Sequence, residues 1–369
     1  MNIIIVRPNT SNFGKIGTYN VQEVGLAKAL IHKGHNVTVI YTHRTVSTIE
    51  TDSTYDYVKY IPHRTFGLHG IFKVNVFSQY SPDLVIMFSD NQLWAKNIIT
   101  WCGKRGIKCI QYMGAVLSDN PKWLNQFYTK LILKRNIRSY KKSINIAKTN
   151  KVRIEMEKLG VRCSGVISVG LDDTILQNTT NLDMQIRASL GFDRDEMVLL
   201  FVGRLVNYKK PMMACDILNT LLKKGVKARL VIIGQGTQKE QLLEYIKQLD
   251  IEKQVTYVGR VSYDSMYRYY VACDCLINLS AQEIFGMTIL EAMYYSIPVV
   301  AHTAPGPNDI IKNKKTGYLI DSDDLNVWCN AIKSAIDNRI ELGTASRKCI
   351  TDNYMWDKIA EQFCDLYSV

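Results

Sequence analysis

The sequence predicts an α/β protein with two doubly wound parallel sheets. Short apolar runs alternate with amphipathic segments of helical length over residues 2–114, and the alternation restarts at residue 197. Such alternation is typical of parallel sheets with helices on both faces. At 369 residues and 47% hydrophobic content, the chain is long and apolar enough for two cores. We therefore expect domains at residues 1–165 and 166–352, and an amphipathic helix at 353–369.

The elements follow in order along each half. Strands are expected first at residues 2–8, 36–42, 83–90 and 107–114. Helical spacing from Val21 to Ile31, with Gly34 as a stop, places a helix between the first two strands. In the second half, the expected strands are residues 197–205, 228–236, 254–261, 274–280 and 297–302, with helices at 211–225, 238–250, 262–273 and 287–296. Parallel sheets bind ligands at the carboxyl ends of their strands, so we expect the two sheets to face a central cleft.

Composition argues against several classes of protein. There is no run of about 18 apolar residues, so we expect no membrane-spanning helix. Residues 1–17 lack a basic start and a cleavage site, so we expect no signal peptide. Nine cysteines occur without a Cys-x-x-Cys pair, which favours reduced thiols in a cytoplasmic protein over a zinc or redox site.

Positive charge is concentrated in the first half. The net charge is +12, and residues 1–165 contain 24 Lys and Arg against nine Asp and Glu. Residues 121–153 contain ten basic residues and no acidic one. Among these cations, apolar residues lie four apart in two series, Trp123, Phe127, Leu131 and Tyr128, Ile132. This pattern suits either an anionic membrane surface or a core helix with a solvated basic face. We expect peripheral association with the inner face of the plasma membrane.

Three loops carry residues suited to chemistry. The first follows the first strand and contains Gly14 and Gly17, which allow close backbone approach to an anion at a helix N-terminus, although a simple tight turn would look the same. It is not G-x-G-x-x-G, and no acid ends the second strand, so a nicotinamide enzyme is disfavoured. The second loop holds Arg204 and Lys209 just past a strand end, where two cations suit a diphosphate rather than plain surface charge.

The third loop holds two acids eight positions apart. Glu283 precedes a turn at Gly286, and Glu291 lies about one turn into the following helix. Carboxylates accept hydrogen bonds from sugar hydroxyls, although a cap or a salt bridge would also explain either acid. The amides of Phe285, Gly286, Met287 and Thr288 lie at the helix N-terminus and suit an anion.

Together these segments resemble the retaining glycosyltransferases of family 4, which have the two-domain GT-B fold. "EIFGMTILE" is similar to the family's E-x7-E motif, and "FVGRLVNYKKP" resembles its strand-end basic segment. "VIIGQG", "YVGRVSYDSMYRYYVACDCLINLS" and "EAMYYSIPVVAH" follow the family pattern in order, and "GKIGTYN" resembles its N-terminal glycine loop. "YMWDKIAEQFCDLY" is similar to its last helix, which implies that residues 353–369 cross back to the first domain. The likeness is weak between Thr42 and Arg162.

The resemblance implies a role for each matching residue. Glu291 would hold the nucleotide ribose, and Glu283 would face the donor sugar. The amides of residues 285–288 would contact sugar and phosphate. Arg204 and Lys209 would neutralise the leaving diphosphate, approached by Gly14 and Gly17 from the other domain. Gly203, Gly234 and Val261 would complete the nucleotide site.

The sequence also departs from the family pattern. Lys15 replaces a second glycine, and Met113 stands where many members have His, so a role for that His cannot be transferred. Asp90 is the acid at an adjacent strand end and could orient an acceptor hydroxyl or simply cap the strand. Val169 replaces the usual Asn before Gly170 at the hinge. Asp193 and Asp195 lie before a strand and are interpreted as a turn, not a metal site.

The implied reaction is front-face transfer with retention and without a metal cofactor. The donor would be a UDP-sugar, or a GDP-sugar because "AHTAPGPNDII" resembles mannosyltransferases that use GDP-mannose. The acceptor would be a lipid-linked or envelope glycan, as in capsule or O-antigen synthesis. Two alternatives remain: a sugar-nucleotide 2-epimerase on the same plan, which the E-x7-E segment disfavours, and a basic nucleic-acid-binding protein. No RNA-binding signature is present, so we expect no nucleic-acid partner.

Overall fold

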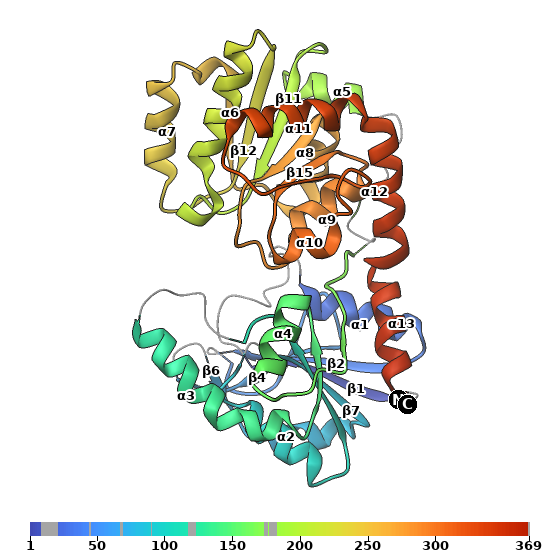
Figure 1. Cartoon of the computed structure of the whole chain (residues 1–369). Coiled ribbons are helices and arrows are strands. Elements are labelled where there is room, and N and C mark those ends of the chain that lie inside the picture. The colour runs from blue at the N-terminus through green and yellow to red at the C-terminus, as the bar shows by residue number, and fades with distance from the viewer. Residues whose placement is uncertain are drawn as a thin grey trace. The chain divides into compact units, whose positions relative to one another are not determined.

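A computed structural model describes residues 1–8, 21–43, 46–66, 69–89, 91–116, 123–172, 176 and 183–367. The chain forms two compact units (Figure 1). Unit 1 contains Met1–Gly170 and Trp356–Val369, and unit 2 contains Leu171–Met355. The sequence placed these boundaries at residues 165 and 353, a few residues earlier in each case.

Unit 1 is built on an eight-stranded sheet in the order β10-β9-β8-β7-β1-β2-β4-β3. Its strands are β1 (Asn2–Arg7), β2 (Asn36–His43), β3 (Glu50–Thr51), β4 (Val58–Pro62), β7 (Leu84–Ser89), β8 (Lys108–Met113), β9 (Ile144–Ala147) and β10 (Gly165–Val166). All neighbours are parallel except β3 and β4. The four strands expected here match β1, β2, β7 and β8. Ile4 of β1 lies between Thr38 and Val85 and is fully buried, as a central parallel strand requires.

The remaining elements of unit 1 cover this sheet. They are the hairpin β5 (Arg64–Phe66) and β6 (His69–Ile71), the 3-10 helix η1 (Val74–Tyr80), and the helices α1 (Gln22–His32), α2 (Ala95–Gly103), α3 (Trp123–Tyr140), α4 (Asn150–Lys158) and α13 (Trp356–Tyr367). The last helix packs on α1 within unit 1. Gly25 permits this contact, because a Cβ there would lie 2.1 Å from the Trp356 indole nitrogen. Phe363 is buried against Tyr112 of β8, with ring centroids 5.1 Å apart.

Unit 2 is built on a six-stranded parallel sheet in the order β13-β12-β11-β14-β15-β16. Its strands are β11 (Met197–Val202), β12 (Ala228–Ile233), β13 (Val255–Gly259), β14 (Cys275–Asn278), β15 (Val299–His302) and β16 (Tyr318–Ile320). Its helices are α5 (Asp183–Ser189), α6 (Pro211–Lys223), α7 (Lys239–Gln248), α8 (Tyr267–Ala272), α9 (Met287–Tyr294), α10 (Pro305–Ile310), α11 (Leu325–Asp337) and α12 (Arg339–Asn353), with 3-10 turns η2 (Asn207–Lys209), η3 (Glu252–Gln254) and η4 (Tyr263–Ser265). The doubly wound prediction is confirmed in each unit.

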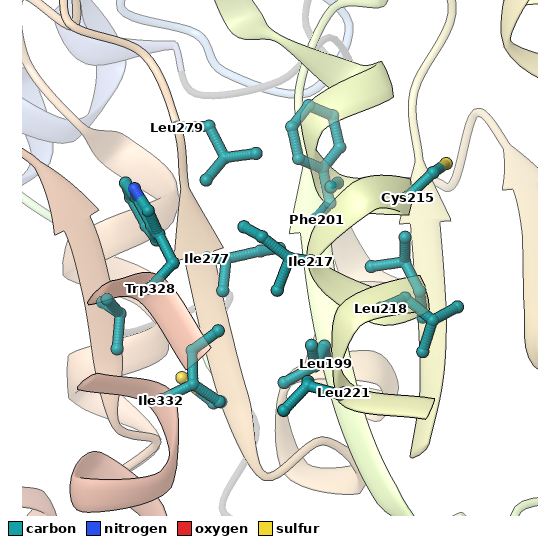
Figure 2. Close-up of a cluster of buried hydrophobic side chains, with 14 of the residues drawn as sticks. Leu199, Phe201, Cys215, Ile217, Leu218, Leu221, Ile277, Leu279, Trp328 and Ile332 are labelled. Atoms are coloured by element: carbon teal, nitrogen blue, oxygen red, sulfur yellow. The ribbon is translucent and has the colours of Figure 1, made fainter. Parts of the chain in front are cut away.

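Strand alternation divides the core of unit 2 into two layers. Leu199 and Ile277 pack on one face with Leu218 of α6 and Trp328 of α11 (Figure 2). Residues of opposite parity, such as Leu200, belong to the other core layer, which includes α8 and α9. Because helices cover both faces of the sheet, the loops that carry polar residues lie at the carboxyl ends of the strands.

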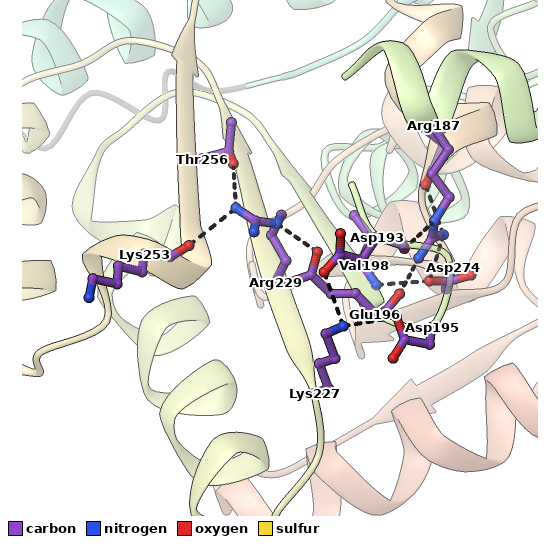
Figure 3. A network of polar contacts seen from close by, with 11 residues as sticks. Arg187, Asp193, Asp195, Glu196, Val198, Lys227, Arg229, Lys253, Thr256 and Asp274 are labelled. Atoms are coloured by element: carbon purple, nitrogen blue, oxygen red, sulfur yellow. Dashed lines mark hydrogen bonds and ion pairs between the residues drawn. The ribbon is translucent and has the colours of Figure 1, made fainter. Parts of the chain in front are cut away.

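The amino ends of the same strands are joined by a polar network (Figure 3). Arg187 of α5 donates to the Asp274 carboxylate at 3.0 Å, and that carboxylate also accepts the Val198 N–H at 2.8 Å. Arg229 donates to Glu196 at 2.8 Å. Residues 194–195 form a turn, as expected for the Asp193–Asp195 segment. The network lies at the end of the sheet opposite to the loops that the sequence singled out.

Candidate functional site

The loops that follow β11, β12 and β13 run backbone against backbone. Gly203 N–H donates to the Ile233 carbonyl at 2.9 Å, and Gly234 N–H donates to the Gly259 carbonyl at 2.7 Å. Gly234 has φ 147°, and a Cβ on it would lie 1.8 Å from the Gly203 carbonyl oxygen. Any side chain would therefore separate the two loops. The structure thus brings together Gly203 and Gly234, both of which the sequence placed in the nucleotide site.

The β11 loop positions both predicted cations around one aromatic ring. The Arg204 guanidinium donates to the Tyr208 hydroxyl, and its carbon lies 5.6 Å from the centre of the Tyr208 ring. Lys209 Nζ lies 5.5 Å from the same ring centre. Arg204 is exposed, whereas Lys209 is half-buried. Two cations at a strand end can bind an anionic group that carries more than one charge.

Lys209 forms an ion pair with the first predicted acid. Its Nζ lies 2.5 Å from Glu283 Oε2, and the two side chains are 17% and 15% exposed. The same oxygen accepts a hydrogen bond from the Asn278 amide at 3.1 Å. Burial would raise the pKa of Glu283, but the Lys209 charge, these hydrogen bonds and the Gly286 N–H together lower it. Glu283 is therefore ionised near neutral pH and accepts hydrogen bonds.

The E-x7-E segment begins a helix at Gly286. Gly286 has φ 75° and precedes α9, whose first residues are Met287 and Thr288. Within the described residues, no side chain caps this helix end. The loop before α9 is held in place by α10, because Gly306 N–H donates to the Glu283 carbonyl at 2.9 Å. The predicted amides thus lie at a helix N-terminus beside the Glu283 carboxylate, as the sequence indicated.

Glu291 is buried inside unit 2 and is not exposed at the edge of the site. It is 1% exposed, and the Tyr270 hydroxyl donates to its Oε2 at 2.5 Å. Tyr263 also hydrogen-bonds to Glu291; burial first and then the Glu291 charge raise the pKa of Tyr263. A carboxylate has about four lone-pair positions, and at Glu291 it already accepts hydrogen bonds from hydroxyl groups. The ribose role of Glu291 remains a prediction.

The other predicted residues are distributed as follows. Val261 follows β13, is half-buried and packs on the α8–α9 core layer. Met113 ends β8 and is buried. Gly14, Gly17 and Asp90 lie outside the described residues. Sequence reasoning missed Tyr208, Asn278, Tyr263 and Tyr270, although Tyr208 immediately precedes Lys209 in the sequence.

The carboxyl edge of unit 1 carries two further cations near the start of α1. Arg7 ends β1 and lies 2.5 Å from Glu23, a buried acid in the first turn of α1. Lys148 follows β9 and donates to Gln22 at 2.8 Å. Its Nζ also lies 4.6 Å from the centre of the Tyr112 ring. The Arg7 charge is therefore paired with an acid, whereas the Gln22 side chain that Lys148 contacts is a neutral amide.

The basic segment 121–153 is not one continuous helix. Within it, residues 123–140 form α3, and the residues after α3 contain a turn, β9 and the start of α4. On α3, Phe127, Tyr128 and Leu131 are 53%, 51% and 48% exposed. Ile132, which the four-residue spacing grouped with Tyr128, is instead buried in unit 1. The exposed cations on α3 are Lys130, Lys134 and Arg138.

The described residues contain neither a metal-binding cluster nor a membrane-spanning helix. Among the described residues, no three His, Cys, Asp or Glu side chains gather closely enough to hold a metal ion. No helix in the described ranges has the length and apolar character that crossing a bilayer requires.

Comparison with known proteins shows that most of unit 2 is similar to one family. Residues 183–353 match the family of glycosyl transferases group 1. An uncharacterized glycosyltransferase of Methanocaldococcus jannaschii is 30% identical over 186 residues, which are 50% of this chain and 47% of that protein. The alpha-monoglucosyldiacylglycerol synthase of Streptococcus pneumoniae is 32% identical over 136 residues, which are 37% of this chain and 31% of that protein. The chain thus spans about half the length, or less, of these curated relatives.

Solved structures extend the likeness of fold to both units. The sucrose-phosphate synthase of Thermosynechococcus elongatus has a TM-score of 0.77 at 16% identity, with 100% of this chain and 98% of that chain covered. HepE of Anabaena, solved in complex with UDP and glucose, has a TM-score of 0.74 at 17% identity, with both chains fully covered. The predicted fold and resemblance are confirmed. The chain has the GT-B fold of glycosyltransferases, and its residues 183–353 are similar to the glycosyl transferases group 1.

Proposed function

We propose that the protein is a retaining glycosyltransferase that moves a hexose from a nucleoside-diphosphate sugar to a lipid-linked or envelope glycan. One observation carries this proposal. Arg204, Lys209, Glu283 and the N-terminus of α9 gather at one edge of the unit 2 sheet. They combine cations and amides for a diphosphate with an ionised acid for sugar hydroxyls.

The proposed mechanism follows from where charge develops. As the bond from sugar to diphosphate breaks, negative charge grows on the leaving oxygen. Arg204, Lys209 and the α9 amides stabilise that charge most strongly in the transition state. The leaving diphosphate itself takes the proton of the acceptor hydroxyl, and the acceptor attacks from the same face. Because the protein's own cations supply the charge, we propose that no metal cofactor is required.

The donor is proposed to be a UDP-sugar, with a GDP-sugar as the alternative. HepE, whose fold this chain shares, was solved with UDP and glucose. Thermal shift measurements with UDP, GDP and their hexose conjugates, each with and without EDTA, test the assignment. We expect one diphosphate to raise the melting temperature equally in both conditions. No shift with any nucleotide would contradict the proposal, and a shift abolished by EDTA would contradict its metal-independent part.

Retention is tested separately on the product. The anomeric proton of newly formed product, followed by NMR before mutarotation, should have the configuration of the donor. The inverted anomer would contradict the front-face mechanism. Conversion of the sugar nucleotide in the absence of any acceptor would favour the epimerase alternative.

We propose that α3 attaches the protein to the cytoplasmic face of the plasma membrane. Phe127, Tyr128 and Leu131 are exposed beside Lys130 and Lys134. Apolar side chains among cations suit the boundary of an anionic bilayer. Each basic residue close to such a surface contributes roughly 1 kcal/mol. A membrane position also suits a lipid-linked acceptor, and the pneumococcal relative is named as an alpha-monoglucosyldiacylglycerol synthase.

Liposome flotation tests this attachment. We expect the protein to float with vesicles of anionic phosphatidylglycerol and to stay at the bottom with neutral phosphatidylcholine. Leu131→Asp should weaken flotation, whereas Ile340→Asp is a matched control, since Ile340 is an 83% exposed apolar residue on α12 of unit 2. Equal flotation of the two variants would remove α3 from the proposal.

A further inference from the structure

Tyr208 is the aromatic residue around which the two predicted diphosphate cations are arranged. The Arg204 and Lys209 charges lie 5.6 Å and 5.5 Å from the centre of its ring. The Arg204 guanidinium also donates to its hydroxyl. Aromatic faces attract cations at this range. One ring therefore holds two like charges that would otherwise repel each other.

The backbone beneath Tyr208 is fixed at both ends. Leu205 is fully buried, and its N–H donates to the Gln235 carbonyl at 3.0 Å. Tyr208 itself lies in the 3-10 turn η2, which is followed by Lys210 with φ 54°. Pro211, the next residue, is buried at the start of α6. Because both sides of the turn are anchored, the position of the ring is set by the fold.

Holding the cations in place before binding lowers the conformational-entropy cost of binding a diphosphate. Long basic side chains lose rotamer freedom when they bind an anion, and this loss reduces affinity. The cation nearer the core is already restrained, because Lys209 also pairs with Glu283. Arg204 is exposed, and its guanidinium donates to the Tyr208 hydroxyl. Without the ring, Arg204 in particular would have to be ordered by the ligand itself.

We propose that Tyr208 is a positioning residue that holds Arg204 and Lys209 ready for the diphosphate of the donor; this inference rests on the proposed function. Tyr208 stabilises the cations without contacting the sugar. Its ring attracts both cations, whereas its hydroxyl accepts a hydrogen bond from Arg204 alone. Loss of the ring therefore weakens recognition of the diphosphate and leaves recognition of the base and ribose unchanged.

Calorimetry on purified variants tests this proposal. The probes are UDP and uridine, or GDP and guanosine if the wild type prefers the guanine nucleotide. Tyr208→Leu should bind the diphosphate up to about tenfold more weakly, because Arg204 must now be ordered on binding while Lys209 stays paired with Glu283. Its affinity for the nucleoside should stay within about twofold of wild type. Tyr208→Phe keeps the ring and should retain most of the affinity for the diphosphate. Tyr208→Met repeats the test if the leucine variant does not fold.

Tyr55→Leu is the matched control, since Tyr55 in unit 1 is another half-buried tyrosine, with Lys28 5.2 Å from its ring centre. This control should bind both probes as the wild type does. Unchanged affinity of Tyr208→Leu for the diphosphate, or an equal loss for the nucleoside, overturns the positioning role while the proposed function stands. If the wild type itself binds nucleoside and diphosphate equally, the proposed function and this inference fail together.

Discussion

Replacing Lys209 by methionine should destabilise unit 2 in a way that depends on pH. Methionine keeps the apolar stem of the lysine and removes the charge that faces Glu283 at 2.5 Å. The carboxylate would then be left in a half-buried position with Asn278 and the Gly286 N–H as partners. Breaking a buried ion pair in this way costs roughly 3–5 kcal/mol. Both side chains retain some contact with water, so we expect about 3 kcal/mol, the lower end of that range.

The direction of the pH effect follows from the pKa of Glu283. In the wild type that pKa is lowered, so the ion pair contributes stability above the ordinary glutamate pKa of about 4.3 and loses it as the pH falls through the lowered value. In the variant, burial raises the pKa of Glu283 without opposition from Lys209. The acid can then bind a proton more easily, which relieves the buried charge. The stability difference between wild type and variant should therefore be largest near pH 7.5 and shrink toward pH 4.

Thermal unfolding monitored by circular dichroism measures this difference. For a unit of this size, a loss of about 3 kcal/mol corresponds to a melting temperature lower by roughly 6–12 °C. Lys210→Met is the matched control, because the neighbouring Lys210 pairs with Asp323, whose side chain is 65% exposed. Such a surface pair contributes only about 0–1 kcal/mol. Equal shifts for the two variants, or a Lys209→Met shift that does not change between pH 7.5 and pH 4, would refute the reasoning.

Three other substitutions have distinct expected outcomes. Arg204→Ala should lower kcat/KM for transfer by about 10²–10³-fold, roughly 3 kcal/mol of transition-state stabilisation; wild-type turnover would exclude Arg204 from the mechanism. Gly234→Ala should abolish nucleotide binding in calorimetry, because its Cβ would lie 1.8 Å from the Gly203 carbonyl oxygen; retained affinity would show that these loops can separate without harm. Arg187→Leu leaves the Asp274 carboxylate without its buried guanidinium partner and should cost about 3 kcal/mol in urea unfolding. Nucleotide affinity of the folded Arg187 variant should be unchanged, and a selective loss of affinity would contradict a purely structural role.

The strands could be predicted from sequence because burial on both faces leaves a direct signal. Residues 197–202 are apolar almost throughout, as a central parallel strand requires, and they form β11. Short polar or edge strands such as β3, with two exposed residues, have no such signal and were not predicted. The end of unit 1 at Gly170 depends on its contact with Trp356, which is far away in the sequence.

The site could be predicted as a set of residues but not as a set of contacts. Lys209 and Glu283 were both expected at the strand ends, yet their ion pair joins residues 74 positions apart. The sequence predicts that Asn278 belongs to a strand, and only the structure shows that its amide donates to Glu283. Spacing also could not decide which face of α3 is buried. The buried face contains Asn136, which donates to the Gln92 carbonyl at 2.8 Å, a partner that periodicity does not reveal.

Unit 1 consists of two segments that lie on either side of unit 2 in the sequence. The order in which the two units are completed during synthesis therefore differs from the order in which they begin. Residues 171–355, which form unit 2, are synthesised before Trp356 and Phe363 become available to unit 1. Until then, the Tyr112 ring and the surface of α1 around Gly25 lack the side chains that bury them in the native state. Because domains generally fold as units during synthesis, unit 2 can reach its native packing while unit 1 still exposes apolar surface. A nascent chain halted within unit 2 should therefore depend on chaperones through its first 170 residues.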